Sequence, residues 1–372
     1  MNGRRLPGEA GAAGLNAAFA AAVLEGLAQP QKRISSVWLY DRRGSELFEE
    51  ITGLAEYYPT RTEIGILEAH APDMARPVGR AAVLVEIGSG SSRKTPILLR
   101  ALAEPHAYVP IDLAHDFFLA SAHALAREFA GLRICPLIAD FTHPFALPDE
   151  LRSDARPRLG FFPGSTIGNL SPGGAIAFLR IMAGALGPGA YMLIGTDCTH
   201  DPTLLLPAYD DTRGVTAAFN LNLLARINRE LGDKDGRDGE DGGSGDGRSA
   251  SGERFALGAF RHEARYRRER GLGRMEMHLV SRRAQSVRLC GRRFDFAAGE
   301  TIHTENSYKY SRDDFRALAR AAGWLPEDCW SDARQRFCVH LLRLSPHAPH
   351  PRTMLRAERA EPPATAPSSS AF

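Results

Sequence analysis

The sequence predicts an open α/β fold joined to a second region of mixed helices and strands. Between residues 80 and 200, short apolar runs alternate with segments whose apolar residues recur at helical spacing. The first run ends in a glycine-rich turn, Gly88-Ser89-Gly90. After Asp197 the pattern changes to long helices and then to the alternation typical of antiparallel strands. Apolar strands that alternate with helices favour a parallel sheet covered on both faces.

Five apolar runs supply the predicted strands of this sheet. In chain order they are AAVLVEIG (81–88), AYVPIDLA (107–114), RICPLIADF (133–141), RLGFFPG (158–164) and YMLIGTD (191–197). The helices predicted between them are TPILLRALAE (95–104), DFFLASAHALAREF (116–129) and AIAFLRIMAGAL (175–186). An open sheet of this kind binds its ligand at the carboxyl ends of the strands.

The chain beyond Asp197 is predicted to form a second domain inserted after the fifth strand. Residues 203–232 have a helical pattern, whereas MEMHLVSR (275–282) and SVRLCGRRFDF (286–296) alternate as antiparallel strands do. The first domain resumes with a helix over 311–324 and a closing strand over 336–344. Two segments, 233–253 and 345–372, carry too few large apolar residues to offset their ordering entropy and are predicted to be a flexible loop and a disordered tail.

Composition excludes several classes of protein. The 46 basic and 44 acidic residues give a net charge of +2, which argues against a nucleic-acid-binding protein. No apolar run approaches the roughly 20 residues of a membrane span, and the N-terminus lacks the apolar core of a secretory signal. The five cysteines form no CxxC pair, so we expect no metal site and no disulfide framework, with Cys135 and Cys338 in the core.

The turn after the first strand predicts a nucleotide-type cofactor. Glycines at 88 and 90 allow the backbone to turn sharply and to approach a ligand closely. A dinucleotide fingerprint would place a third glycine where this chain has Arg93. Glu86 would repel the phosphates of NAD, but it suits a cationic sulfonium. S-adenosylmethionine is therefore favoured over NAD, and an NAD oxidoreductase is disfavoured.

Acidic residues also end the second and third strands. Asp112 lies where an open α/β fold presents a carboxylate to ribose hydroxyls, although a helix cap explains it equally well when it is taken alone. Asp140 and Phe141 suit the amine and the ring face of adenine, although such a pair is more often a cap and a core residue. Acidic groups at three successive strand ends favour the cofactor interpretation. Residues 161–170 lack the Asn-Pro-Pro-aromatic run of methyltransferases that act on bases, so chemistry on flipped DNA bases is disfavoured.

Several long motifs are unusual: YDRRGSELFEEITGLAEYYPTRTE (40–63), EIGSGSSRKT (86–95), YVPIDLA (108–114), IADF (138–141), FFPGSTIGNLSP (161–172), AYDDTRGVTAAFNLNLLARINRELG (208–232), MEMHL (275–279) and TENSYKY (304–310). Together they resemble the L-histidine Nα-methyltransferase family, which makes hercynine in ergothioneine biosynthesis. The resemblance covers residues 30–344. It implies a Rossmann-like class I SAM-dependent methyltransferase domain (61–200 plus 301–344) and a second α+β substrate-binding domain (10–60 plus 201–300).

The resemblance also implies site residues. Gly88, Gly90, Lys94, Asp112, Asp140 and Phe141 match cofactor contacts. Tyr57, Asn169, Tyr209, Glu305 and Ser307 match histidine contacts, and Tyr40, Phe48, Gly164 and Met277 match the surroundings of the methyl-accepting nitrogen and the imidazole. Two imidazole partners, Glu305 and Ser307, would separate histidine from an apolar isostere.

The implied reaction is trimethylation of the histidine α-amine, which leaves S-adenosylhomocysteine as the second product. The enzyme positions a neutral amine without a strong catalytic base, and aromatic faces at Tyr40 and Phe48 stabilise the quaternary ammonium. Two alternatives stay open: methylation of another amino acid or of partly methylated histidine, and a non-catalytic SAM-binding protein. We expect a cytoplasmic monomer whose partner is L-histidine, with no nucleic acid and no membrane.

Overall fold

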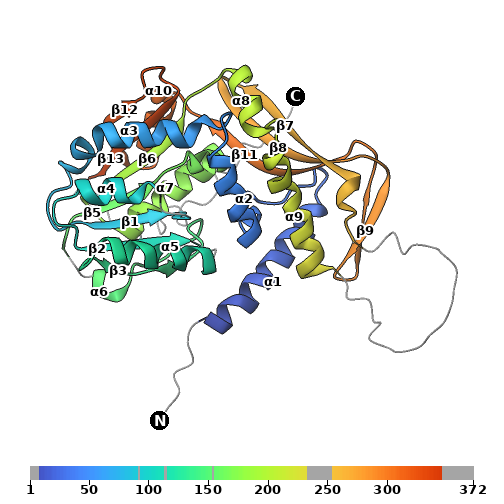
Figure 1. Cartoon of the computed structure of the whole chain (residues 1–372), viewed down its shortest axis with the longest axis horizontal. Helices are drawn as coiled ribbons and strands as arrows, with labels where there is room; N and C mark the ends of the chain where they lie inside the picture. The colour runs from blue at the N-terminus through green and yellow to red at the C-terminus, as the bar shows by residue number, and fades with distance from the viewer. Residues whose placement is uncertain (1–7, 91–92, 113–114, 153–154, 233–253, 346–372) are drawn as a thin grey trace, which may run out of the picture.

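A mixed eight-stranded sheet organises the larger lobe of the protein (Figure 1). The structure is a computed structural model that describes residues 8–90, 93–112, 115–152, 155–232 and 254–345. Its strand order is β12-β13-β6-β5-β1-β2-β3, with β4 also paired to β2. The strands are β1 (Val83–Ile87), β2 (Ala107–Asp112), β3 (Arg133–Ile134), β4 (Leu137–Ile138), β5 (Arg158–Phe162), β6 (Tyr191–Asp197), β12 (Trp324–Ser331) and β13 (Phe337–Leu344).

The strands from β6 to β3 are parallel, as predicted, whereas β13 and β12 run antiparallel to their neighbours. Helices cover both faces of this sheet, which explains why its strands are apolar throughout. In β1, Val83 and Val85 belong to one buried cluster and Leu84 to the other. The first cluster includes side chains of α7 and α10, and the second includes side chains of α3 and α4. These helices are α3 (Tyr58–Ala75), α4 (Thr95–Ala101), α5 (His115–Glu128), α6 (Asp149–Arg152), α7 (Pro172–Leu186) and α10 (Arg312–Ala321).

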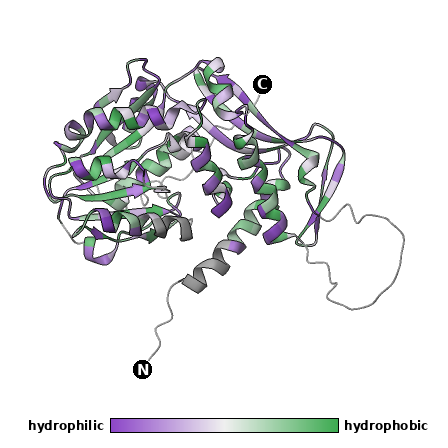
Figure 2. Cartoon of the chain, in the orientation of Figure 1, coloured by the Kyte–Doolittle hydropathy of each residue, from purple (hydrophilic) through white to green (hydrophobic). Residues whose placement is uncertain are grey.

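The smaller lobe packs helices against an antiparallel three-stranded sheet with the order β11-β8-β7. Figure 1 shows α9 lying along this sheet, with α2 between the lobes, and Figure 2 shows apolar residues on the inward sides of these helices. The elements are α1 (Gly8–Leu27), η1 (Ser36–Leu39), α2 (Arg42–Thr52), η2 (Thr166–Asn169), α8 (Pro202–Tyr209), α9 (Val215–Leu231), η3 (Leu257–Ala259), β7 (Phe260–Glu269), β8 (Leu272–Ser281), β9 (Gln285–Leu289), β10 (Arg292–Phe296) and β11 (Thr301–Lys309).

Strand pairing differs from the prediction in four places. The third run divides into β3 and β4, because it is interrupted at Cys135 and Pro136, and proline has no N–H to donate to a ladder. Residues 286–296 form the hairpin β9–β10 and not one strand, since Cys290 and Gly291 both have positive φ (48° and 73°), as a tight hairpin turn requires. Both β7 and β12 were missed: β7 carries many charged residues, and β12 has a proline and two adjacent acidic residues that interrupt its apolar pattern.

The predicted domain boundary at residue 301 falls at the start of β11. That strand pairs with β8 and so belongs to the sheet of the smaller lobe. The division into two domains stays a prediction. The pairing of β11 with β8 assigns residues 301–309 to the predicted substrate-binding domain and not to the predicted methyltransferase domain. The predicted loop 233–253 and tail 345–372 lie outside the described residues, except for Ser345. Among the described helices, none combines the length and apolarity needed to cross a bilayer.

Candidate active site

The turn after β1 forms one wall of the site. Gly88 and Gly90 both have positive φ (65° and 46°), which glycine adopts without strain. The Gly88 N–H donates to the carbonyl of Ile111 at 2.8 Å, and the Gly90 N–H donates to Oδ2 of Asp112 at 3.1 Å. A Cβ at Gly88 would meet nothing within 4 Å. The turn is thus held against the end of β2 while its outer side stays open, and these residues fit a nucleoside-type cofactor.

Glu86 lies beneath this turn and not on its surface. Its side chain is buried, and it accepts hydrogen bonds from Thr95 Oγ1 at 2.7 Å and from the Tyr108 hydroxyl. Burial raises the pKa of Glu86 to about 7, although both hydroxyl donors lower it. The carboxylate therefore joins β1, β2 and α4 from inside.

Asp140 and Phe141 follow β4 at the same edge of the sheet. The Asp140 carboxylate accepts from the Thr142 N–H and hydroxyl and contacts His143. These hydrogen bonds outweigh the opposing effect of partial burial and lower the pKa of Asp140. The Phe141 ring packs edge-on against Phe162 at 5.8 Å between centroids, so this ring is also part of the core.

A buried ion pair ties α3 to the start of α4. Glu63 is fully buried and pairs with Lys94, and its Oε2 accepts the Gly164 N–H at 2.7 Å. A Cβ at Gly164 would lie 3.6 Å from Lys94 Nζ, so the two predicted residues are neighbours. Glu63 therefore holds the turn after β5, and Lys94 pairs with Glu63 beside that turn. No sequence pattern had singled out Glu63.

A β-bulge in β11 creates the opposite wall. The register with β8 shifts between His303 and Glu305, so that Ile302 lies opposite Leu279 while Glu305 lies opposite Met277. Leu279 and Met277 are two residues apart and share a face. The extra residue therefore places Glu305 on the same face as Ile302, with Ser307 and Lys309 following at alternate positions.

The polar groups of this wall form a buried network. Lys309 Nζ donates to Asp197 Oδ2 at 2.8 Å, to the Tyr209 hydroxyl at 2.8 Å and to Ser307 Oγ at 3.0 Å. Tyr209 donates to Ser307 Oγ at 2.7 Å, and Tyr58 donates to Asp197 at 2.7 Å. The charged side chains of Lys309 and Asp197 are both fully buried. The network joins β6 of the large sheet to β11 of the small one.

Glu305 stands at the end of this network without joining it. Its Oε2 is buried and has no hydrogen-bond partner among the described residues. Burial raises the pKa of Glu305 to about 8, and the charge of Lys309 opposes that rise. An unpaired buried carboxyl costs free energy unless a ligand pairs it.

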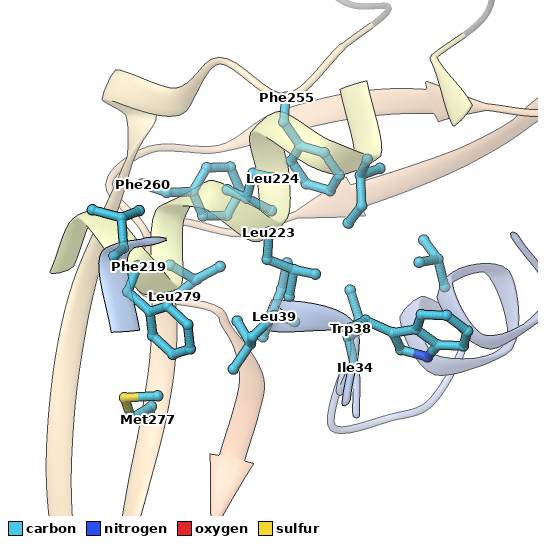
Figure 3. Close-up of a cluster of buried hydrophobic side chains, with 14 of the residues drawn as sticks. Ile34, Trp38, Leu39, Phe219, Leu223, Leu224, Phe255, Phe260, Met277 and Leu279 are labelled. Carbon is cyan, nitrogen blue, oxygen red and sulfur yellow. The ribbon is translucent and has the colours of Figure 1, made fainter. Parts of the chain in front are cut away.

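Aromatic rings line the space beside Glu305. Tyr40 contacts Phe48 at 5.5 Å and Phe219 at 5.4 Å between centroids, Phe48 contacts Tyr57 at 6.2 Å, and Tyr57 contacts Tyr209 at 6.4 Å. These five residues are called the aromatic cluster below. Figure 3 shows Phe219 of α9 beside Met277 of β8 in the core that supports it. Burial, then the charge of Glu305, raises the pKa of the Tyr40 hydroxyl well above its usual value.

The two walls face one another across the lobes. Asp112, at the end of β2, is close enough to Tyr40 to be among the charges that raise the pKa of that hydroxyl. Arg93, which follows the glycine turn, donates from its guanidinium to Thr52 Oγ1 of α2 at 3.2 Å. Asn169 ends η2, which packs on β11 so tightly that a Cβ at Gly168 would lie 2.7 Å from the Tyr308 carbonyl. The predicted residues of both walls are therefore gathered around one region.

An open groove of about 540 Å³ lies elsewhere, between α3 and the β12–β13 turn. Arg61, His70 and Arg334 are among its lining residues, and none of the predicted site residues is. The predicted site residues thus lie around the two walls and not around this groove.

Lysine usage carried a signal for two of the residues that the sequence prediction missed. The chain has four lysines among its 46 basic residues. Each of the three described ones pairs with a carboxylate, and two of those partners, Glu63 and Asp197, are fully buried. The rarity of lysine in this arginine-rich chain thus indicated that Lys309 pairs with a buried carboxylate, which is that of Asp197.

Comparison with known proteins identifies the family of the chain. Residues 19–344 match the family described as "Histidine-specific methyltransferase, SAM-dependent". The chain belongs to this family. It is 38% identical over 325 residues to the histidine N-alpha-methyltransferase of Mycolicibacterium smegmatis and 40% identical over 324 residues to that of Mycobacterium tuberculosis, covering 86% of this chain and 92% of each relative. It is also 33% identical over 208 residues to ergothioneine biosynthesis protein 1 of Neurospora crassa, which covers 54% of this chain and 23% of that protein.

Proposed function

We infer that the protein transfers methyl groups from S-adenosylmethionine to the α-amine of L-histidine and forms hercynine, the first step of ergothioneine biosynthesis. Family membership supports the cofactor and the histidine substrate. One observation in the structure carries the choice of histidine: a buried, unpaired carboxyl at Glu305 lies on the same strand face as the Ser307 hydroxyl.

The hydrogen bonds that Ser307 already makes determine which imidazole nitrogen its hydroxyl contacts. Ser307 Oγ accepts from Tyr209 and from Lys309, and a hydroxyl oxygen has two acceptor sites. Its own proton is therefore left to donate. Neutral imidazole carries one N–H and one bare nitrogen, so Glu305 accepts from the first while Ser307 donates to the second. An apolar side chain would leave both groups unpaired.

The remaining polar groups hold the amino-acid end. Tyr57 and Asn169 supply donors for the substrate carboxylate, while the Gly164 turn and Met277 shape the space beside the imidazole and the amine. On the cofactor wall, Gly88, Gly90, Lys94, Asp112, Asp140 and Phe141 hold or position the nucleoside. When bound, the cofactor supplies a methyl group on a sulfonium.

The chain's own contribution to the chemistry is positional. The reference α-amine of a peptide has a pKa of ~8, so only a minor fraction is neutral near pH 7 and the substrate amine must lose a proton before it attacks. Tyr40 keeps its proton at that pH, because burial raises its pKa, and it acts as a hydrogen-bond partner and not as a phenolate base. Proton release then passes to water.

The aromatic cluster suits the product of repeated methylation. Each added methyl group displaces water from the nitrogen, and the final product is a cation that no longer donates a hydrogen bond. Ring faces attract such a cation by roughly 0.5–2 kcal/mol. Tyr40 and Phe48 are the rings that we assign to this role.

The deciding experiment incubates the purified protein with S-adenosylmethionine and each of the twenty amino acids separately, with products read by mass. We expect a gain of three methyl groups on histidine alone. A larger yield with tyrosine or another amino acid would reassign the substrate within the same fold. Bound cofactor with no methylated amino acid would favour the non-catalytic alternative.

We also infer that the enzyme acts as a cytoplasmic monomer on a small molecule, without nucleic acid. The near-neutral charge and the free thiols support this. Sedimentation at enzyme concentrations used for assay tests the monomer.

A further inference from the structure

Three cysteines and a histidine gather on one face of the large sheet, and none of them is among the proposed site residues. Cys329 of β12 lies opposite His340 of β13, and Cys338 of β13 lies opposite Thr196 of β6. Cys338 and His340 are two residues apart on one strand, so they share a face. Cys198 lies two residues beyond Thr196 and approaches its hydroxyl at 3.8 Å.

The potential ligand atoms of three members, Cys329, Cys338 and His340, are close together, and Cys198 is next to them through its hydrogen bond with Cys338. Sγ of Cys329, Sγ of Cys338 and a ring nitrogen of His340 all lie within 4.8 Å of one another. Cys338 and His340 are buried, whereas Cys329 is partly exposed and leaves a path for entry. Tetrahedral zinc ligation holds such atoms roughly 3.3–3.8 Å apart, which small side-chain rotations reach.

His340 supplies an independent observation. Its Nε2 contacts Thr196 Oγ1 at 3.0 Å, but its Nδ1 is buried without a hydrogen-bond partner among the described residues. The side chain is fully buried, and the Phe315 ring of α10 lies 4.5 Å away between centroids. A metal at Nδ1 would satisfy that atom, and Nε2–H would then donate to Thr196 as an outer-shell partner that orients the ring.

The sulfur atoms contact one another and a cation. The Cys338 thiol is hydrogen-bonded with the Cys198 and Cys329 thiols, and the Arg312 guanidinium of α10 also contacts it. Arg312 also donates to Ser331 Oγ at 3.4 Å, which places the guanidinium over β12. Three thiolates around a divalent ion leave one net negative charge, and Arg312 compensates it.

We propose that Cys198, Cys329, Cys338 and His340 form a structural site for a thiophilic divalent ion, Zn²⁺. Sulfur and nitrogen donors in a closed set of four are the ligands of structural zinc. The ion would join the ends of β6, β13 and β12, one residue from Asp197 and its pair with Lys309. When the cysteines bind the ion, the protons of their thiols are released to solvent.

The test titrates the reduced, chelator-treated full chain with Co²⁺. We expect the visible bands of tetrahedral cobalt and a thiolate charge-transfer band that saturate at one equivalent and are bleached by Zn²⁺. Cys329→Ser and Cys338→Ser should weaken binding by more than the roughly 10–100-fold that loss of an outer-shell partner costs. Cys290→Ser, at an exposed thiol of the β9–β10 turn, is the matched control and should bind as the parent does.

Two further readouts keep the test decisive if Cys338→Ser does not fold. Zn²⁺ should protect three thiols of the parent from a disulfide reagent and raise its unfolding temperature, with neither effect in Cys329→Ser. A reduced parent chain without tetrahedral cobalt bands would overturn the site. So would bands that survive in Cys329→Ser, or thiol reactivity that Zn²⁺ leaves unchanged.

Discussion

The cofactor wall and the β11 wall use opposite physical strategies. The cofactor wall presents backbone turned by Gly88 and Gly90 and a carboxylate, Asp140, whose side chain is 40% exposed and whose pKa is lowered by local hydrogen bonds. On the β11 wall, Lys309 is fully buried and Glu305 is buried with a pKa raised to about 8. On the cofactor wall, the buried carboxyls Glu86 and Glu63 are paired within the protein, whereas on the β11 wall the buried Glu305 Oε2 has no partner among the described residues. Changes on the β11 wall should therefore cost more.

The largest effect is expected from Lys309→Met. It leaves Asp197 buried with no cation, and such a loss destabilises by about 3–5 kcal/mol. Urea unfolding measures this, and Asp140→Asn on the cofactor wall is the comparison, expected to cost below about 1 kcal/mol. The double variant Lys309→Met with Asp197→Asn should recover part of the loss. Equal costs at Lys309 and Asp140 would remove the contrast between the walls.

Glu305→Gln should change catalysis more than stability. Leaving a buried donor without its partner costs about 1–3 kcal/mol, so kcat/KM for histidine should fall roughly 5–100-fold. Affinity for S-adenosylmethionine, measured by calorimetry, should stay within about twofold because the cofactor wall is untouched. A matching loss of cofactor affinity would show that the two walls do not act separately.

Glu305→Gln should also change how the free energy of unfolding depends on pH. The pKa of Glu305 is raised from 4.5 to about 8, so between these values the folded state binds more protons than the unfolded state. Its contribution to stability is complete below pH 4.5 and is lost as pH rises through about 8. Glu86, with its pKa raised to about 7, adds a slope of the same sign. Unfolding free energies across this range should decline less steeply in Glu305→Gln, and an unchanged slope would contradict the assignment.

Gly88→Ala tests the backbone strategy of the cofactor wall. The space for a methyl group is open, but a φ of 65° costs a side-chain residue about 1–2 kcal/mol. We expect that loss in stability together with weaker cofactor binding. Gly53→Ala is the control, because Gly53 has an ordinary φ of −91°. Equal effects of the two changes would argue against a special role for the turn.

The smallest effects concern the aromatic cluster. Phe48→Ala should shift products from trimethylated toward mono- and dimethylated histidine by a few-fold, since one ring face contributes ~0.5–1 kcal/mol at a partly exposed site. Tyr40→Phe keeps the ring and should shift them less. Mass spectrometry of the product mixture measures both. Unchanged ratios in both variants would contradict the role assigned to these rings.

Much of the cofactor wall could be predicted from sequence because its residues are local. Each strand and the turn that follows it are contiguous, so Gly88, Asp112 and Asp140 could be placed at strand ends before any packing was known. The residues that were missed act over long separations. Glu63 meets Lys94 across 31 positions, and Asp197 meets Lys309 across 112, and neither contact has a local pattern.

Cysteine usage shows the same limit. With no CxxC pair, spacing argued against a metal site, yet strand pairing brings Cys329 opposite His340 and next to Cys338. Pairing between antiparallel strands joins residues that spacing alone separates.

The sequence by itself determined the alternation of strands and helices, the glycine turn and the family, because periodicity and contiguous motifs encode them. The tertiary structure decided which face of β11 its polar residues occupy, since a single bulge reverses the alternation after His303. It also decided that Lys309 and Asp197 meet in the interior and that Glu86 faces inward. Burial converts these ordinary side chains into groups that need partners, and burial is a property of packing.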